Sequence, residues 1–476
     1  MDGDVSMDGI ESTDFQQRSD AFLHWLKSRP GTKINPNIEL VDLRQRGAGR
    51  GVVAKADIEE DEELFSVARS DILSVDNSGF TKHSAAREYV AGLEDPWMSL
   101  ILVLIYEHLR GSASPWKPYF DILPSSFDTL MFWTEDELAE LQASAVRQKI
   151  GKAGADEAFE ERVWGFVQSH SDLFPGLRKE EVMALAHRMG STIMAYAFDI
   201  EKEPSKQEQD EEGYISDEED EMLPKGMVPL ADMLNADADR NNARLEYGEN
   251  EVTMKALKPI KAGEEIFNDY GPLPRADLLR RYGYITQNYE QYDVVEVALD
   301  DFTTIAEQMG QKKVDEKCAY LEKIEVLEDA YDITRGEDGD LATMIPEEMA
   351  VLVNTLVLDD SAFAELKKNK KSRPSVQLDR ASVPLLENVL EQRLSQYAST
   401  LQEDDILIKE FYNLAAYPNQ ATKRKRMAIH VRHGEKEILT GTLNKLRAIS
   451  GAGSEDKGKR KHEEENGQSS KKSRVR

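Results

Sequence analysis

The chain has 476 residues, of which 40% are hydrophobic, so most of it can fold into globular domains. Its formal net charge of −30 at pH 7 disfavours general binding to nucleic acid or to anionic membranes, since both require a basic face. The only cysteine, Cys318, excludes an internal disulfide and a cysteine-based zinc cluster. The acidity favours a basic partner, although an acidic surface also serves solubility alone.

The N-terminal region begins with an acidic, polar segment, residues 1–15, which predicts disorder and contains no secretory signal. Residues 16–28 place their apolar side chains on one face and predict a helix. Short alternating runs at 38–43, 51–58 and 63–69 predict the strands of a compact β unit.

The middle of the chain, residues 84–200, is predicted to be mainly helical. Residues 96–111 are apolar almost all round, which predicts a buried helix that is too short to span a membrane. Thr134 and Glu137 have the spacing of a capping box at a helix start. The acidic, low-complexity residues 201–223 predict a solvated loop. Because neither a secretory signal nor a membrane-spanning run is predicted, we expect a soluble intracellular protein.

Strand patterns return after this loop, at residues 227–234, 243–258 and 264–271, with a hairpin predicted around residues 248–250. The predicted fold is therefore α+β, a single β domain over residues 16–290 that is split by a helical insertion.

The C-terminal part, residues 291–450, contains amphipathic runs and predicts an all-α domain. The tail at 451–476 carries two basic clusters around an acidic patch, and such clusters are typical of nuclear import or of a disordered tail that touches RNA.

The first candidate site is a glycine turn, Gly47-Ala48-Gly49-Arg50-Gly51. Glycines let a backbone approach a ligand closely. β-branched residues follow the turn instead of a helix, which disfavours a Rossmann or phosphate-binding loop. On its own, the turn is equally consistent with a plain glycine hairpin.

Two further candidates lie beyond the acidic loop. Asn235 follows the apolar run PLADML, and an asparagine there is usually a turn residue. Tyr270 and Tyr282 each precede a glycine, and either tyrosine alone is more often a core aromatic residue with its hydroxyl at the surface.

Taken together, the order of these motifs resembles the SET-domain methyltransferases, in the group with a split SET domain and a helical C-terminal domain typified by the Rubisco large-subunit methyltransferase. The resemblance runs from about residue 18 to 450 and includes the typical segment 114–133. It is greatest for fungal ribosomal lysine methyltransferases, because Asn235-Ala236-Asp237 stands where most relatives have Asn-His.

The resemblance implies S-adenosylmethionine as the cofactor and a site made from separate segments. Tyr270 matches the active-site tyrosine of the family. The cofactor would be held by Ala48, Gly49 and Arg50 through their backbone, and by Asn235, Ala236 and Tyr282. The substrate pocket would include Tyr247, Tyr196 and Trp97.

The resemblance further implies a protein-lysine N-methyltransferase that acts on a basic ribosomal protein, the large-subunit protein L42. Three alternatives stay open: a nuclear methyltransferase of histones or transcription factors, a histidine methyltransferase, and a non-catalytic SET scaffold that binds a partner. No metal and no membrane association are expected. The expected location is the nucleus, and an additional presence in the cytoplasm stays open.

Overall fold

The computed structural model describes residues 7–46, 48–200, 223–336, 339–368, 373–412 and 419–471, and within them side chains from residue 14 to residue 450 except Arg46. Gly47, residues 201–222 of the predicted acidic loop, residues 1–6 of the predicted disordered N-terminus and the side chains of the basic tail lie outside the described residues. Residues 7–15 of that N-terminal segment belong to the helix α1 (Met7–Lys27).

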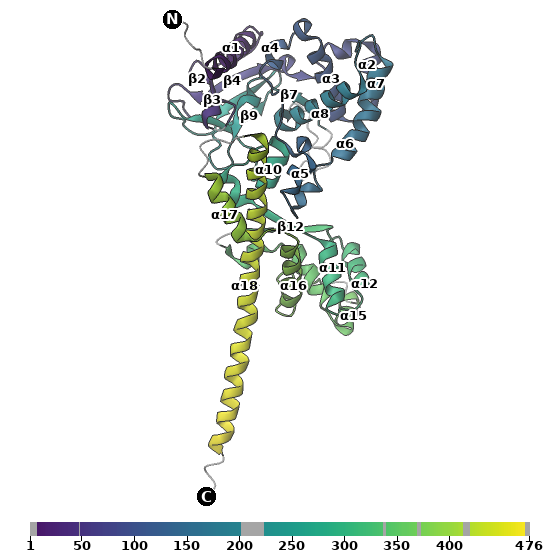
Figure 1. The fold of residues 1–476 in the computed structure, drawn as a ribbon, viewed down its shortest axis with the longest axis vertical. Helices are drawn as coiled ribbons and strands as arrows, with labels where there is room; N and C mark the ends of the chain where they lie inside the picture. The colour runs from purple at the N-terminus through teal and green to yellow at the C-terminus, as the bar shows by residue number, and fades with distance from the viewer. Residues whose placement is uncertain are drawn as a thin grey trace. The chain divides into compact units, whose positions relative to one another are not determined.

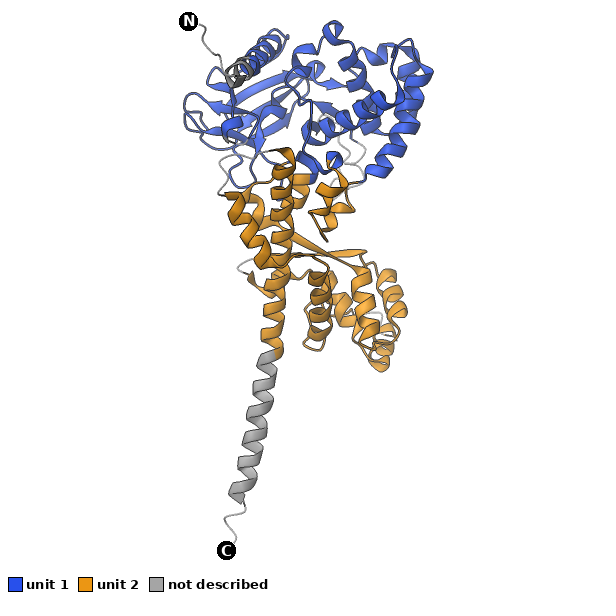
Figure 2. Ribbon diagram, in the orientation of Figure 1, with its two compact units in different colours: residues 1–132, 151–272, 280–283 blue, residues 133–150, 273–279, 284–476 orange. Residues whose placement is uncertain are grey.

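The chain divides into two compact units (Figure 2). Unit 1 comprises residues 1–132, 151–272 and 280–283, and unit 2 comprises residues 133–150, 273–279 and 284–476. The boundaries predicted for the two domains at 290 and 291 remain predictions.

Unit 1 contains an antiparallel sheet in the order β1-β4-β10-β9, made of β1 (Lys33–Ile34), β4 (Glu63–Ala68), β10 (Glu251–Ala256) and β9 (Ala243–Tyr247). Strands β9 and β10 pair directly, which confirms the predicted hairpin. Every second residue of β10 is buried, as expected of a sheet with one face on a core.

A second sheet of unit 1 has the order β2-β3-β11-β8, made of β2 (Ile38–Asp42), β3 (Arg50–Ala54), β11 (Glu265–Asn268) and β8 (Asn235–Ala236). Strand β11 pairs antiparallel with β3 and parallel with β8. This sheet therefore joins the predicted glycine turn to the two later motifs, across the helical insertion.

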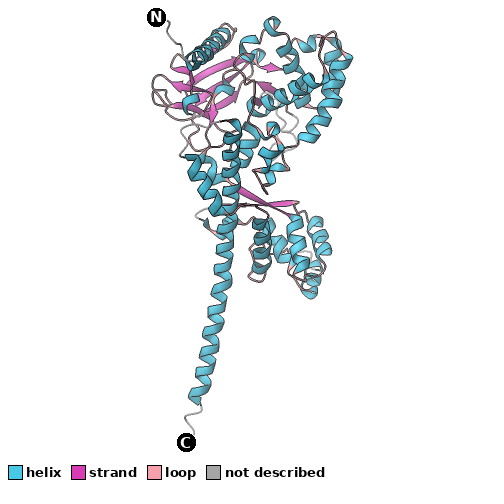
Figure 3. Cartoon of the chain, in the orientation of Figure 1, coloured by secondary structure: helices cyan, strands magenta, loops and turns pink. Residues whose placement is uncertain are grey.

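A third, smaller sheet of unit 1 has the order β5-β7-β6, with β5 (Leu73–Ser74), β7 (Lys225–Met227) and β6 (Ala197–Asp199). Figure 3 shows the strands of unit 1 in magenta, with most of the helices of the unit to their right. The apolar sides of sheets and helices share one core of buried residues.

The helices of unit 1 follow the predicted pattern in most places (Figure 1). The predicted buried helix is α3 (Pro96–Leu109), in which residues 100–105 are at most 1% exposed. Asp95 caps its start by accepting from the backbone of Trp97 and Met98. The other α-helices here are α1 (Met7–Lys27), α2 (Ser84–Leu93), α4 (Lys117–Phe120), α6 (Lys152–Ala158), α7 (Gly165–Ser169) and α8 (Lys179–Tyr196).

One strand prediction in unit 1 is wrong over most of its length. Residues 227–234 form only the end of β7 and then a 3-10 turn, Ala231–Met233. Leu230 has φ +77°, outside the extended region of a regular strand. The error arises because nearly the whole run is buried, so it shows no alternation that separates a strand from a turn.

Unit 2 is mainly helical, as predicted, and also contains a two-stranded antiparallel sheet of β12 (Val294–Ala298) and β13 (Ala330–Thr334). The predicted capping box is confirmed at the start of α5 (Glu135–Ala139). The other helices that begin in unit 2 are α10 (Arg275–Tyr282), α11 (Leu299–Gln308), α12 (Val314–Lys323), α13 (Leu341–Met344), α14 (Glu347–Leu356), α15 (Asp360–Lys368), α16 (Val383–Ser395), α17 (Leu401–Tyr412) and α18 (Gln420–Lys471).

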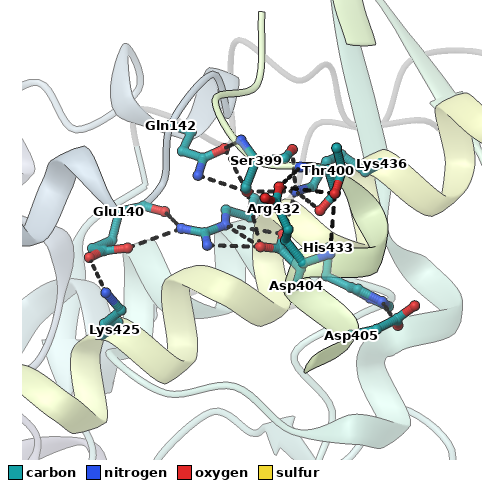
Figure 4. A network of polar contacts seen from close by, with 11 residues as sticks. Glu140, Gln142, Ser399, Thr400, Asp404, Asp405, Lys425, Arg432, His433 and Lys436 are labelled. Atoms are coloured by element: carbon teal, nitrogen blue, oxygen red, sulfur yellow. Dashed lines mark hydrogen bonds and ion pairs between the residues drawn. The ribbon is translucent and has the colours of Figure 1, made fainter. Parts of the chain in front are cut away.

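A buried polar network fixes α17 to α18 and to the α5 segment within unit 2 (Figure 4). Asp404 accepts from Arg432 (Nη2–Oδ1 2.8 Å) and contacts Lys436, and all three side chains are at most 2% exposed. Burial opposes ionisation of Asp404, but the hydrogen bonds from Arg432 and Lys436 lower its pKa overall. Glu140 joins this network through Arg432 and Lys425.

Within the described ranges, no helix has both the length and the apolar character needed to cross a bilayer.

Candidate functional site

The glycine turn and the segment around Asn235 are joined by direct hydrogen bonds. The amide Nδ2 of Asn235 donates to the carbonyl oxygen of Arg50 at 3.2 Å and to Oε1 of Glu265 at 2.7 Å. These three residues come from β8, β3 and β11, so the sheet itself positions them. A backbone carbonyl, a carboxylate and an amide thus meet at one place.

Gly51, at the end of the turn, lies close to three side chains. A Cβ atom there would lie 2.4 Å from Cδ1 of Leu43, 2.9 Å from Oε1 of Glu265 and 3.0 Å from Nδ2 of Asn235. The close approach predicted for the glycines is therefore, at this position, an approach to protein atoms. At Gly49, by contrast, a Cβ would meet nothing within 4 Å, so the turn is open on that side.

Ala48 and Gly49 form a closed turn with Leu43. The N–H of Ala48 donates to the carbonyl oxygen of Leu43 (3.2 Å), and the N–H of Leu43 donates to the carbonyl oxygen of Gly49 (2.9 Å). These two hydrogen bonds hold the shape of the turn. A ligand bound here would therefore meet the other backbone N–H and C=O groups of the turn.

Tyr270 and Tyr282 stack on one another, with ring centroids 4.4 Å apart and planes 11° apart. Tyr270 lies two residues after β11, and Tyr282 is the last residue of α10. Burial raises the pKa of Tyr282. The two half-buried rings form a stacked pair next to the sheet that contains Asn235, because Tyr270 follows β11 directly.

The glycine after each of these tyrosines has a structural role. Gly271 and Gly283 both have φ +76°, a left-handed conformation that favours glycine. A Cβ on Gly283 would also lie 2.8 Å from backbone atoms of Asp128 and Thr129. The two Tyr-Gly pairs therefore mark sharp turns that fix the aromatic rings.

Asp232, in the PLADMLN segment, is a buried acidic residue that the sequence interpretation did not single out. It is 4% exposed, and its Oδ2 accepts from the hydroxyl of the fully buried Tyr119. Backbone N–H groups of Leu230 and Asp232 itself face the carboxyl group, but Oδ1 completes no hydrogen bond. Burial raises the pKa of Asp232 to about 8. The only sequence signal for it is one carboxylate within an apolar run.

Tyr196, predicted for the substrate pocket, belongs to the same buried group. Burial, followed by the charge of Asp232, raises the pKa of Tyr196 to about 12. Tyr196 also interacts electrostatically with Arg50 and Tyr119. The structure therefore brings Tyr196 together with the arginine of the glycine turn.

Trp97 and Tyr247, the other two predicted pocket residues, belong to a group around β6 and β7. The hydroxyl of Tyr247 donates to the carbonyl oxygen of Asp199 at 2.6 Å. Lys225 pairs with the Asp199 carboxylate and lies 5.5 Å from the ring centroid of Trp97. These contacts connect Tyr247 to Trp97 through Asp199 of β6 and Lys225 of β7.

The residues that meet at Asn235, together with the stacked pair Tyr270 and Tyr282, fit S-adenosylmethionine. The amide of Asn235, the Glu265 carboxylate and the Arg50 carbonyl suit the charged amino-acid end of such a molecule. The stacked Tyr270 and Tyr282 suit an aromatic base. Among the described residues, no three His, Cys, Asp or Glu side chains gather as metal ligands.

Comparison with known proteins identifies the family. The SET domain family matches residues 49–271, and the Rubisco LSMT substrate-binding family matches residues 310–439. Ribosomal lysine N-methyltransferase 4 of Saccharomyces cerevisiae is 34% identical over 338 residues, which cover 67% of this chain and 68% of that protein. The chain belongs to the SET-domain protein lysine methyltransferases.

Two other similarities support this membership. The human N-lysine methyltransferase SETD6 is 31% identical over 424 residues, which cover 82% of this chain and 83% of that protein. A crystal structure of the SET domain of LSMT bound to methyllysine and S-adenosylhomocysteine has the same fold, with a TM-score of 0.63, 20% identity and coverage of 90% of this chain and 91% of that one.

As a SET-domain lysine methyltransferase, the chain is an enzyme that uses S-adenosylmethionine to methylate a protein. The predicted family, fold and cofactor are thereby confirmed. The SET match begins at residue 49, so α1 and the first strands precede it.

Proposed function

We propose that this methyltransferase modifies a lysine of a ribosomal protein, with the large-subunit protein L42 as the first substrate to test. The support is the 34% identity to a yeast protein named as a ribosomal lysine methyltransferase. The segment Asn235-Ala236-Asp237, which replaces the usual Asn-His, adds to it. The net charge of −30 suits a basic substrate of this kind.

The observation that carries the site assignment is the hydrogen bond between Asn235 and the glycine turn. In the proposed site, backbone groups of Ala48, Gly49 and Arg50 bind the amino-acid end of the cofactor. Asn235, the backbone of Ala236 and the ring of Tyr282 complete the cofactor pocket. Tyr270 is the proposed catalytic residue, and Tyr196, Tyr247 and Trp97 are the proposed substrate-pocket residues.

The chemistry requires a neutral lysine amine, because a protonated amine has no lone pair. The reference pKa of lysine is about 10.4, so the site must favour loss of a proton to water. Burial of the amine beside Tyr270, away from water, disfavours its charged form and supplies this effect. The hydroxyl of Tyr270 then orients the amine lone pair, which is catalysis by positioning. When bound, S-adenosylmethionine supplies a methyl group on a positively charged sulfur.

A non-ribosomal substrate is the second candidate, and a specific observation favours it. Human SETD6 aligns over a larger share of this chain than the yeast protein does, 82% against 67%. The basic clusters in residues 451–476 support a nuclear location, in which histones or transcription factors would be accessible.

The test is methylation of two extracts from cells that lack this protein, one enriched in ribosomes and one in nuclear proteins. Purified full-length enzyme is added with labelled S-adenosylmethionine, and the modified residue is identified by mass spectrometry. Label on a lysine of L42 supports the proposal, and label confined to histones or transcription factors selects the second candidate. Label on histidine, or cofactor binding with no label anywhere, contradicts both.

A further inference from the structure

The side chain of Arg50 does not face the glycine turn to which its backbone belongs. Its Nε donates to Oγ of Ser19 at 2.9 Å, and its Nη1 donates to the carbonyl oxygen of Ile122 at 3.0 Å. Burial, with smaller effects from Arg18 and Arg44, lowers the pKa of Arg50 to about 10. Two of the described hydrogen bonds of this guanidinium therefore go to α1, because Nη2 also donates to the carbonyl oxygen of Phe15 at 3.4 Å.

Phe15 contacts two arginines, Arg44 before the turn and Arg50 within it. Its ring centroid lies 3.8 Å from the guanidinium carbon of Arg50 and 4.0 Å from that of Arg44. A cation over an aromatic face is attracted by the ring, so one phenyl group stabilises two charges that repel each other. Asp42 holds the Arg44 side chain through three hydrogen bonds, of 3.0, 3.1 and 2.7 Å.

Ser19 completes the contact from a buried position. It is 2% exposed, accepts from Arg50 and donates its own hydroxyl to the carbonyl oxygen of Phe15 at 2.9 Å. Phe22 and Leu26, one and two turns further along α1, are fully buried in the core of unit 1. Phe22 and Leu26 thus anchor α1 in the core, while Phe15 and Ser19 of the same helix contact the arginines at the turn.

The backbone of Arg50 links this contact to the site, because its carbonyl oxygen accepts from Asn235. A displaced Arg50 side chain would move that carbonyl oxygen and the adjacent Ala48 and Gly49. A shift of about 1 Å is enough to weaken a pre-organised site strongly.

We propose that Phe15 and Ser19 are positioning residues for the cofactor: they hold the Arg50 side chain against α1 and so keep the 48–50 turn in the shape that binds S-adenosylmethionine. The proposal rests on the role proposed above for this turn. Both residues precede the part of the chain that matches the SET domain family. The binding site accordingly extends, through α1, beyond the family domain.

The experiment measures binding of S-adenosylhomocysteine to the full-length protein by calorimetry, with thermal unfolding of every variant. Phe15→Leu keeps an apolar side chain but removes the aromatic face, whereas Phe15→Tyr retains the aromatic face. We expect about fivefold to tenfold weaker binding for Phe15→Leu and a near-normal value for Phe15→Tyr, the usual magnitude of cation–π contacts. Ser19→Ala should also weaken binding, and in activity assays KM for S-adenosylmethionine should rise with little change in kcat.

Two controls separate positioning from simple stability. Gln17 is exposed on the same helix, and Gln17→Ala should bind as the wild type does. In an Arg50→Gln background, Phe15→Leu should cause no further loss, because the ring then has no guanidinium of Arg50 to hold. Unchanged binding by Phe15→Leu, or a loss that Phe15→Tyr does not restore, overturns the proposal. Failure of the wild type to bind the probe would instead contradict the proposed function.

Discussion

The side-chain amide of Asn235 donates to the carbonyl oxygen of Arg50 across 185 positions of sequence. This contact joins the two motifs on which the proposed cofactor site depends. It also defines the most direct test of that site.

Asn235→Ala removes both the bond to Arg50 and the bond to Glu265 at 2.7 Å. We expect a loss of about 1–3 kcal/mol in cofactor affinity, since each hydrogen bond contributes about 0.5–1.5 kcal/mol. Calorimetry with S-adenosylhomocysteine measures it. Asn235→Asp should bind still more weakly, because it places a second carboxylate beside Glu265; tighter binding by this variant would contradict the assignment.

Gly51→Ala should destabilise the fold by about 1–3 kcal/mol, the usual cost of forcing extra atoms into a packed site. The added Cβ would lie 2.4 Å from Leu43 and 2.9 Å from Glu265. Urea unfolding of both variants provides the measurement, and Gly49→Ala is the matched control because a Cβ there meets nothing within 4 Å. Equal stability of the two variants would show that the turn does not approach Asn235 as described.

Tyr270→Phe keeps the ring that stacks at 4.4 Å on Tyr282 but removes the hydroxyl proposed to orient the amine. We expect kcat to fall by about 10²-fold or more, in the range seen when one polar group that acts in the transition state is removed. Cofactor affinity should change little. Single-turnover methylation together with calorimetry separates the two quantities, and a fall in affinity alone would reassign Tyr270 to cofactor binding.

Asp232→Asn should make the stability of the protein depend less on pH. The folded-state pKa of Asp232 is about 8 against an ordinary value of 3.8, so the folded state favours the protonated carboxyl. Stability that this carboxyl contributes is fully present below pH 4 and is lost as the pH rises towards 8, by at most about 1.4 kcal/mol per pH unit. The amide cannot ionise and can still accept from Tyr119.

The measurement for Asp232 is the free energy of unfolding of both proteins between pH 5 and 8.5. The difference between Asp232→Asn and the wild type should shift in favour of the variant as the pH rises. A constant difference over this range would mean that Asp232 ionises normally in the folded protein.

Arg432→Ala should destabilise unit 2 by about 3–5 kcal/mol, because it leaves the fully buried Asp404 without its main partner. Arg447→Ala on the same helix is the control. Arg447 pairs with Glu391, but both side chains are more than half exposed, so at most about 1 kcal/mol should be lost. Thermal unfolding of the two variants tests the contrast, which similar losses would contradict.

Much of this architecture could be predicted from local patterns. The hairpin of β9 and β10, the capping box at Thr134 and the buried helix α3 each depend on residues that are close in sequence. The family and its cofactor followed from the order of several motifs. The turn at Ala231–Met233 could not be predicted, because burial on all sides hides its periodicity.

Contacts between distant residues were also beyond prediction. Asp232 meets Tyr119 across 113 positions, and nothing local to either residue indicates the pairing. Tyr247 contacts Asp199 and Trp97 contacts Lys225, and nothing local to these residues indicates either contact. Which aromatic side chains line the same pocket depends on how the third sheet packs, and such packing leaves no periodic signal in the sequence.

The order of strands β2-β3-β11-β8 has a consequence for synthesis on the ribosome. Strands β2 and β3 emerge first, but their neighbours β11 and β8 are translated only after the whole helical insertion. A nascent chain that ends before residue 235 therefore has the glycine turn without its amide partner. Pairing between strands so distant in sequence forms slowly. Binding of the nucleoside part of the cofactor should therefore appear late in folding, and its appearance should show that the sheet is complete.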